Sequence, residues 1–243
     1  MDDLLHIFPL TSDAWKDAHK TSNQGDDSEK SSSKSVLSKL NSGLKEHLVL
    51  VSAVEQWHLP LLFQCAVSYA SEGKRVLFIR RKPLERLPLS VHGMSQPEAS
   101  VLKNVKFMYY TSVRDLISFC ANVHTQTLPP ETVIVDDLGY FIQQMKELSP
   151  EQGMVKLWCL LTDAVHFIEQ KSGERVPLVL AIHDKIKSLP DLCWRFPIKT
   201  AVITGPASDD AKFSVKMTFK HHVLCCTYEM GTGGLMLASV QVT

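Results

Sequence analysis

Two neighbouring carboxylates, Asp136 and Asp137, stand directly after a run of β-branched apolar residues, Val133 to Val135. Such a run, without polar alternation, is typical of a strand buried on both faces in the middle of a parallel sheet. Ligands bind at the carboxyl ends of strands in these sheets, and an apolar strand that ends in Asp has the form of a Walker B element, which holds a nucleotide's magnesium ion. The alternative is a core strand followed by a solvated Asp-Asp turn. A phosphate loop elsewhere in the chain would decide between them.

The phosphate loop would lie between the first predicted strand, residues 47–51, and the apolar helix predicted over residues 59–70. A functional loop needs glycines whose N–H groups wrap the phosphates, a lysine for the β and γ oxygens, and a hydroxyl for magnesium. The segment at this place contains neither glycine nor lysine, Leu59 replaces the hydroxyl, and Glu55 would repel a triphosphate. The residues of this degenerate loop are Ser52, Glu55, His58 and Leu59. The sequence therefore keeps the Walker B form without the chemistry of Walker A.

A basic run, Arg80, Arg81 and Lys82, follows the second predicted strand, residues 75–79. Basic side chains at the end of a strand could contact the phosphate backbone of DNA. A solvated charged face is the ordinary alternative. We therefore treat these three residues as candidate DNA contacts.

A second polar position follows the strand predicted over residues 176–182, where His183 could serve as a sensor of bound nucleotide or could have no function. The stretch from His221 to Cys226 invites a zinc site. Residues four apart on a strand lie about 13 Å apart, however, and cannot share one tetrahedral ion. We expect no metal site.

The composition is that of an ordinary globular protein, with 243 residues, 44% hydrophobic residues and a net charge of zero. No apolar run approaches the roughly 18 residues of a membrane span, so no membrane contact is expected. Asp2 and Asp3 occupy the place where a secretory signal would be positive. The six cysteines show no Cys-x-x-Cys spacing, which indicates reduced thiols in a cytoplasmic or nuclear protein.

The chain divides near residue 35. Residues 1–34 are predicted to form an acidic, largely disordered tail. The reason is that residues 21–35 are rich in Ser, Asp and Lys and lack large apolar residues. A short apolar segment near the start of the tail includes Ile7 and Phe8. It could dock on a partner or fold back over the domain, and the sequence does not choose between these.

Residues 35–243 predict one α/β domain. Buried strands alternate with amphipathic helices up to residue 182, which favours right-handed β-α-β units and a mainly parallel sheet flanked by helices. Short strands separated by turns follow from residue 198, which favours antiparallel strands at the end of the sheet. The further strands are predicted over residues 105–110, 131–138, 198–204, 213–219, 222–228 and 235–242, and the further helices over residues 111–123 and 150–171.

The order and spacing of these pieces resemble the RecA-like recombinase paralogues, in particular the small ATPase-like subunit of the vertebrate Shu complex. The likeness rests on residues 76–84, 103–124 and 133–137, and it extends over about residues 48–194. It implies a RecA-like P-loop NTPase core. Within it Asp136, with Asp137 beside it, matches the Walker B acid, and His183 takes the sensor position. No acid follows Ile79, where RecA-like ATPases place the base that activates water.

The resemblance also implies a function. Members of the family pair with a SWIM-type zinc-finger protein, bind single-stranded DNA and support assembly of a strand-exchange recombinase during homologous recombination in the nucleus. Because the phosphate loop is degenerate, we expect a pseudo-ATPase that needs no cofactor. The alternative is a DNA-stimulated ATPase with an atypical loop, which would use ATP and magnesium. A dinucleotide-binding enzyme is disfavoured because no Gly-x-Gly follows the first strand.

Overall fold

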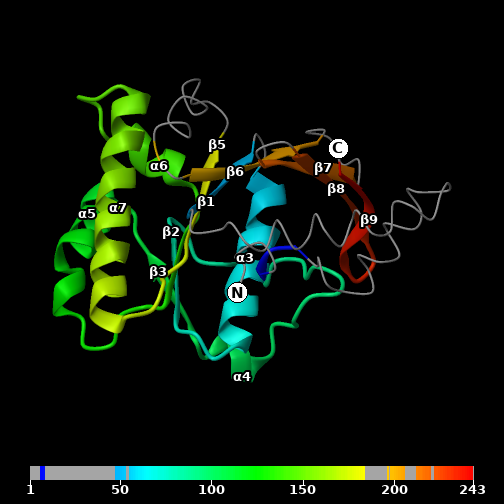
Figure 1. Cartoon of the computed structure of the whole chain (residues 1–243), viewed down its shortest axis with the longest axis horizontal. Helices are drawn as coiled ribbons and strands as arrows, with labels where there is room; N and C mark the ends of the chain where they lie inside the picture. Colours follow the sequence, from blue (N-terminus) through cyan, green and yellow to red (C-terminus); the bar gives the residue numbers. More distant parts are fainter. Residues whose placement is uncertain are drawn as a thin grey trace.

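The computed structural model describes residues 6–8, 47–52, 55–183, 196, 198–205, 212–219 and 222–242. Its centre is a nine-stranded sheet in the order β3-β2-β4-β5-β1-β6-β7-β8-β9 (Figure 1). Neighbouring strands from β3 to β6 pair in parallel and those from β6 to β9 pair antiparallel. The strands are β1 (His47–Ser52), β2 (Val76–Arg80), β3 (Val105–Tyr109), β4 (Thr132–Val135), β5 (Leu178–His183), β6 (Ile198–Thr204), β7 (Lys212–Phe219), β8 (His222–Gly231) and β9 (Gly234–Val242). The arrangement confirms the predicted α/β fold, with a mainly parallel sheet that ends in antiparallel strands.

Helices cover both faces of the parallel strands (Figure 1). They are α3 (Glu55–Ser71), α4 (Ala99–Leu102), α5 (Val113–Asn122), α6 (Leu138–Gln143) and α7 (Pro150–Ser172), with a 3-10 turn, η3 (Val123–Thr125), after α5. Local signals fix the ends of the longer helices. Ser112 and Ser149 each form a capping box at the start of α5 and α7, and Gly73 and Gly173 adopt positive φ after α3 and α7.

The sheet separates two hydrophobic cores. One lies between α3 and the sheet and extends under β7, β8 and β9, where Phe213, Leu224 and Tyr228 are buried. The other lies between the parallel strands and α5, α6 and α7, where Trp158 and Phe141 are buried. Strands buried on both faces explain the apolar runs without polar alternation.

The helix predicted over residues 59–70 begins four residues earlier, at Glu55. Trp57 and His58 are both buried. Their packing contacts stabilise a first helical turn in residues that the sequence had predicted to be a loop. The short helices α4 and α6 were not predicted, because elements of this length show no apolar period.

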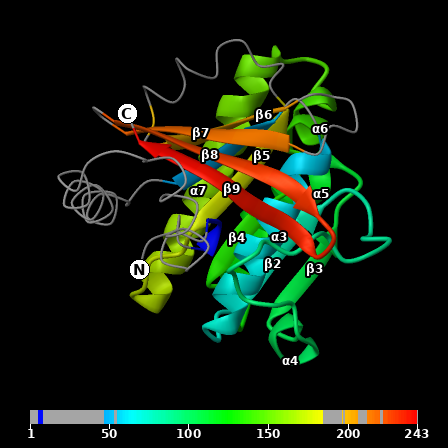
Figure 2. The ribbon, with the colours of Figure 1, turned by 90° about the vertical axis from the view of Figure 1, so that its right-hand side faces the viewer.

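The antiparallel end of the sheet curls back toward the loop that follows β2 (Figure 2). Val91 in this loop forms a parallel bridge with Leu235 at the start of β9. The backbones approach so closely that a Cβ on Gly234 would stand 2.3 Å from the carbonyl oxygen of Ser90, and Gly234 has φ +138°. Only glycine fits this contact, which holds the C-terminal hairpin against the loop.

The short described segment near the N-terminus, His6 to Phe8, belongs to the core beside α3 (blue in Figure 1). Ile7 and Phe8 are fully buried. The His6 ring stacks on Tyr69 with ring centroids 3.7 Å apart, and its Nε2 lies 3.1 Å from a carboxylate oxygen of Glu72. Of the two readings of the apolar segment, these residues support folding back. The linker predicted over residues 21–35 lies outside the described residues.

Burying Ile7 and Phe8 stabilises the closed arrangement by roughly 3–6 kcal/mol. Residues 9–46 connect Phe8 to β1, and the length-dependent cost of closing a loop of this size is about 3 kcal/mol. The free energy gained by burying the two side chains therefore only modestly exceeds the cost of closing the loop.

Cys120, Cys159 and Cys226 are free thiols. Burial raises the pKa of Cys120 to about 12 and raises the pKa of Cys226 still further, so both stay protonated and act as core side chains. Cys159 is exposed. Among the described residues, no helix combines the length and apolar character that crossing a membrane requires.

Candidate functional site

Asp136 is the centre of the candidate site, directly after β4. Its side chain is 2% exposed and both carboxylate oxygens have partners. Oδ1 lies 2.9 Å from Nε2 of His58, and Oδ2 lies 3.2 Å from Nε of Arg80. Because an ionised carboxylate can only accept, Nε2 of His58 must carry the proton of the shared hydrogen bond. The Asp136 carboxylate is therefore held inside the protein by two side chains.

The register of the sheet brings Arg80 to Asp136. β2 and β4 pair in parallel, with Val76 opposite Thr132 and Ile79 opposite Val135. Residues separated by 56 positions, as Arg75 and Glu131 are, thus meet across these two strands. Three basic–acidic pairs obey this spacing: Arg75 with Glu131, Arg80 with Asp136, and Arg81 with Asp137. These pairs were not predicted from the sequence, although their constant spacing is a signal that the sequence contains.

The second carboxylate, Asp137, organises the surface above this pair. Its backbone has φ 54°, and its side chain accepts a hydrogen bond from the backbone N–H of Tyr140 in the first turn of α6. Nε of Arg81 lies 3.5 Å from Asp137, and the guanidinium stands 5.2 Å from the centre of the Tyr140 ring. The Tyr140 hydroxyl in turn donates to the carbonyl of Thr111. Asp137 thus caps a helix and orients Arg81.

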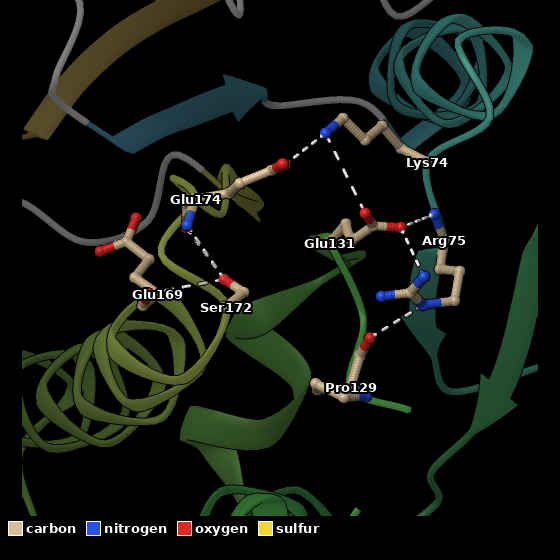
Figure 3. A network of polar contacts seen from close by, with 7 residues as sticks. All are labelled: Lys74, Arg75, Pro129, Glu131, Glu169, Ser172 and Glu174. Atoms are coloured by element: carbon tan, nitrogen blue, oxygen red, sulfur yellow. Dashed lines mark hydrogen bonds and ion pairs between the residues drawn. The ribbon is translucent and has the colours of Figure 1, made fainter. Parts of the chain in front are cut away.

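Charge pairs also lie at the N-terminal ends of β2 and β4 (Figure 3). A Glu131 carboxylate oxygen lies 2.9 Å from the Arg75 backbone nitrogen and 3.0 Å from the Arg75 guanidinium. Lys74 donates a 2.7 Å hydrogen bond to Glu174, which lowers the pKa of that carboxyl and raises the pKa of Lys74. Lys74 and Arg75 are therefore neutralised in place.

The segment at the phosphate-loop position is short. β1 ends at Ser52 and α3 begins at Glu55, so residues 53 and 54 alone connect them. Ser52 is buried, and Leu59 packs against the core beside α3. The first turn of α3 directs His58 toward Asp136. Among the described residues, Nδ1 of His58 has no hydrogen-bond partner. Of the four candidate loop residues, His58 is the one with a contact to Asp136 in the described part of the chain.

His183, the candidate sensor residue, ends β5. It pairs with Ser52 in the ladder with β1, so its backbone lies at the same edge of the sheet as Ser52.

The three residues of the basic run differ in exposure. Arg80 is 6% exposed and paired with Asp136, which removes it from the candidate DNA contacts. Arg81 is partly exposed, and Lys82 is exposed. The three basic residues therefore do not form one surface cluster.

Within the described ranges, no three His, Cys, Asp or Glu side chains come close enough to share a metal ion.

Comparison with known proteins gives one informative relative. No protein-family model matches the chain. It is 32% identical over 128 residues to the mouse (Mus musculus) protein named ATPase SWSAP1, and the match covers 52% of this chain and 44% of the relative. The chain thus spans less than half of the relative's length. The similarity supports the resemblance to RecA-like paralogues of the Shu complex.

Replacing Arg80 tests whether it neutralises Asp136. Arg80→Met keeps an apolar stem but leaves the buried carboxylate with His58 alone, so we expect the free energy of unfolding to fall by about 3 kcal/mol in urea denaturation. The matched change Lys82→Met, at an exposed position, should alter it by no more than about 0.5 kcal/mol. Equal effects of the two changes would show that Arg80 has no such role.

Proposed function

We propose that this RecA-like chain is a non-catalytic recombinase paralogue, which pairs with a SWIM-type zinc-finger protein and supports assembly of a strand-exchange recombinase on single-stranded DNA. The proposed setting is homologous recombination repair in the nucleus. The similarity to ATPase SWSAP1 supports a RecA-like, recombination-related role. The partner, the DNA and the compartment are our extension of that similarity.

The engagement of Asp136 carries the non-catalytic part of the proposal. A Walker B acid works when its oxygens are available to magnesium or to the water that the ion holds. Here one oxygen faces His58 and the other faces Arg80. The Arg80 guanidinium supplies the positive charge that a metal ion would otherwise bring.

The other groups that would hold a magnesium nucleotide do not fit the requirement. Helix α3 begins three residues after the end of β1, which leaves little chain to wrap phosphates. The position of the loop hydroxyl is taken by Leu59, which packs on the core. Arg80 occupies the place after Ile79 where RecA-like ATPases carry an acidic base. We therefore propose that the chain works without ATP or magnesium.

The alternative is a DNA-stimulated ATPase with an atypical loop. The name of the relative, ATPase SWSAP1, favours it. For this chain to hydrolyse ATP, Asp136 would have to exchange Arg80 and His58 for magnesium. That exchange would leave the Arg80 cation buried without its partner, which is unfavourable.

A reconstitution tests the proposed function. The full chain is co-expressed with the SWIM-type protein and purified without nucleotide, and loading of the recombinase on single-stranded DNA is followed by fluorescence. We expect a stable complex that accelerates loading, while the chain shows neither a magnesium-dependent thermal shift with ATP nor ATP turnover. Failure to bind the partner or to accelerate loading would contradict the scaffold role. Saturable, magnesium-dependent turnover by the chain would instead establish the ATPase alternative.

DNA contact is proposed for Lys82, with Arg81 as a weaker contributor because Asp137 already neutralises part of its charge. Lys82→Ala should weaken binding of single-stranded DNA and lower the slope of log affinity against log salt by about 0.7. Lys103→Ala is a matched control. Lys103 is also exposed, but it precedes β3, whereas Lys82 follows the parallel strand β2, so the two lie at opposite ends of these strands. Affinities measured by fluorescence anisotropy that are the same for the wild type and Lys82→Ala would reject this contact.

A further inference from the structure

The surface that buries the N-terminal segment has the features of a peptide-docking site. Its occupant, His6 to Phe8, lies beside α3 and contributes to the core that extends under β7, β8 and β9. Ile7 and Phe8 are fully buried. Three consecutive side chains therefore fill one site, although the next described residue of the chain is His47.

The site distinguishes between side chains. The His6 ring lies flat on Tyr69, with an interplanar angle of 7°, and its Nε2 is 3.1 Å from Glu72. Both partners lie near the end of α3, and the two following residues enter the apolar core. The segment that lies on this surface presents an aromatic polar side chain followed by an aliphatic and an aromatic one.

We infer that this surface is a separable docking site, and that it accepts the same N-terminal segment from a second copy of the chain. A second copy carries the matching side chains, so exchange between two copies preserves every contact that the segment makes in its own chain. Residues 9–46 give enough reach by their number alone, because 38 residues can span at most about 125 Å. Binding within one chain is favoured only because the segment is tethered close to its site, at an effective concentration on the order of 1 mM. Exchange between two copies loses this advantage and no contact.

Binding of a free peptide tests the docking site. A fluorescein-labelled peptide of residues 1–12 is titrated with the full-length wild type and with full-length Phe8→Ala, and anisotropy is measured. Phe8→Ala weakens the chain's own anchor, so we expect it to bind the peptide at least about tenfold more tightly than the wild type, whose segment competes. Leu128→Ala, at an exposed position, should bind as the wild type does. A peptide with Ser in place of Ile7 and Phe8 should bind none of them.

A second variant guards against loss of folding. His6→Ala removes the stack on Tyr69 and the contact with Glu72 but keeps Ile7 and Phe8, so its affinity for the peptide should lie between those of the wild type and Phe8→Ala. A peptide that binds folded His6→Ala no better than it binds the wild type would overturn the docking site.

Light scattering tests the second copy as the occupant. Over a concentration series that reaches about 1 mM, the wild type should become increasingly dimeric, and addition of the free peptide should return it to monomers. A wild-type chain that stays monomeric over the whole series, or whose dimer resists the peptide, would overturn exchange between copies.

Discussion

The burial of the Asp136 carboxylate is the constraint on which the candidate site depends. An isolated ionised carboxylate inside a protein is strongly unfavourable, so it must be paired and hydrogen-bonded. In a nucleotide-binding site, magnesium and the loop lysine balance such an acid. Here Arg80 from the neighbouring strand and His58 from the first turn of α3 surround it. The end of β2, the end of β4 and the start of α3 are thereby held together by one carboxylate.

Much of the fold could be predicted from the sequence, because buried strands, amphipathic helices and capping residues leave local signals. The parallel sheet, the antiparallel end and the long helix α7 all follow from apolar patterns and turns. The short helix α6 could not be predicted in this way. It depends on Asp137 as a cap and on packing of Phe141 and Ile142, neither of which produces a period in six residues.

The candidate site was only partly predictable. Asp136 and the lack of glycine and lysine in residues 52–59 are visible in the sequence, but local reasoning assigned Arg80 to a surface cluster with Arg81 and Lys82. The spatial neighbour of Arg80 is set by the pairing of β2 with β4, which is a property of the sheet order. The fate of Ile7 and Phe8 also depends on tertiary packing, since an apolar segment outside the domain gives no sign of which surface it covers.

A double-mutant cycle between Arg80 and Asp136 measures whether the two side chains neutralise each other. The free energy of unfolding is measured for the wild type, Arg80→Met, Asp136→Leu and the double variant. If the two side chains neutralise each other, each single change leaves a buried charge, whereas the double variant removes both. The account predicts a coupling energy of at least about 1.5 kcal/mol, with the double variant more stable than the sum of the single effects implies. Losses that add to within about 0.5 kcal/mol would contradict it.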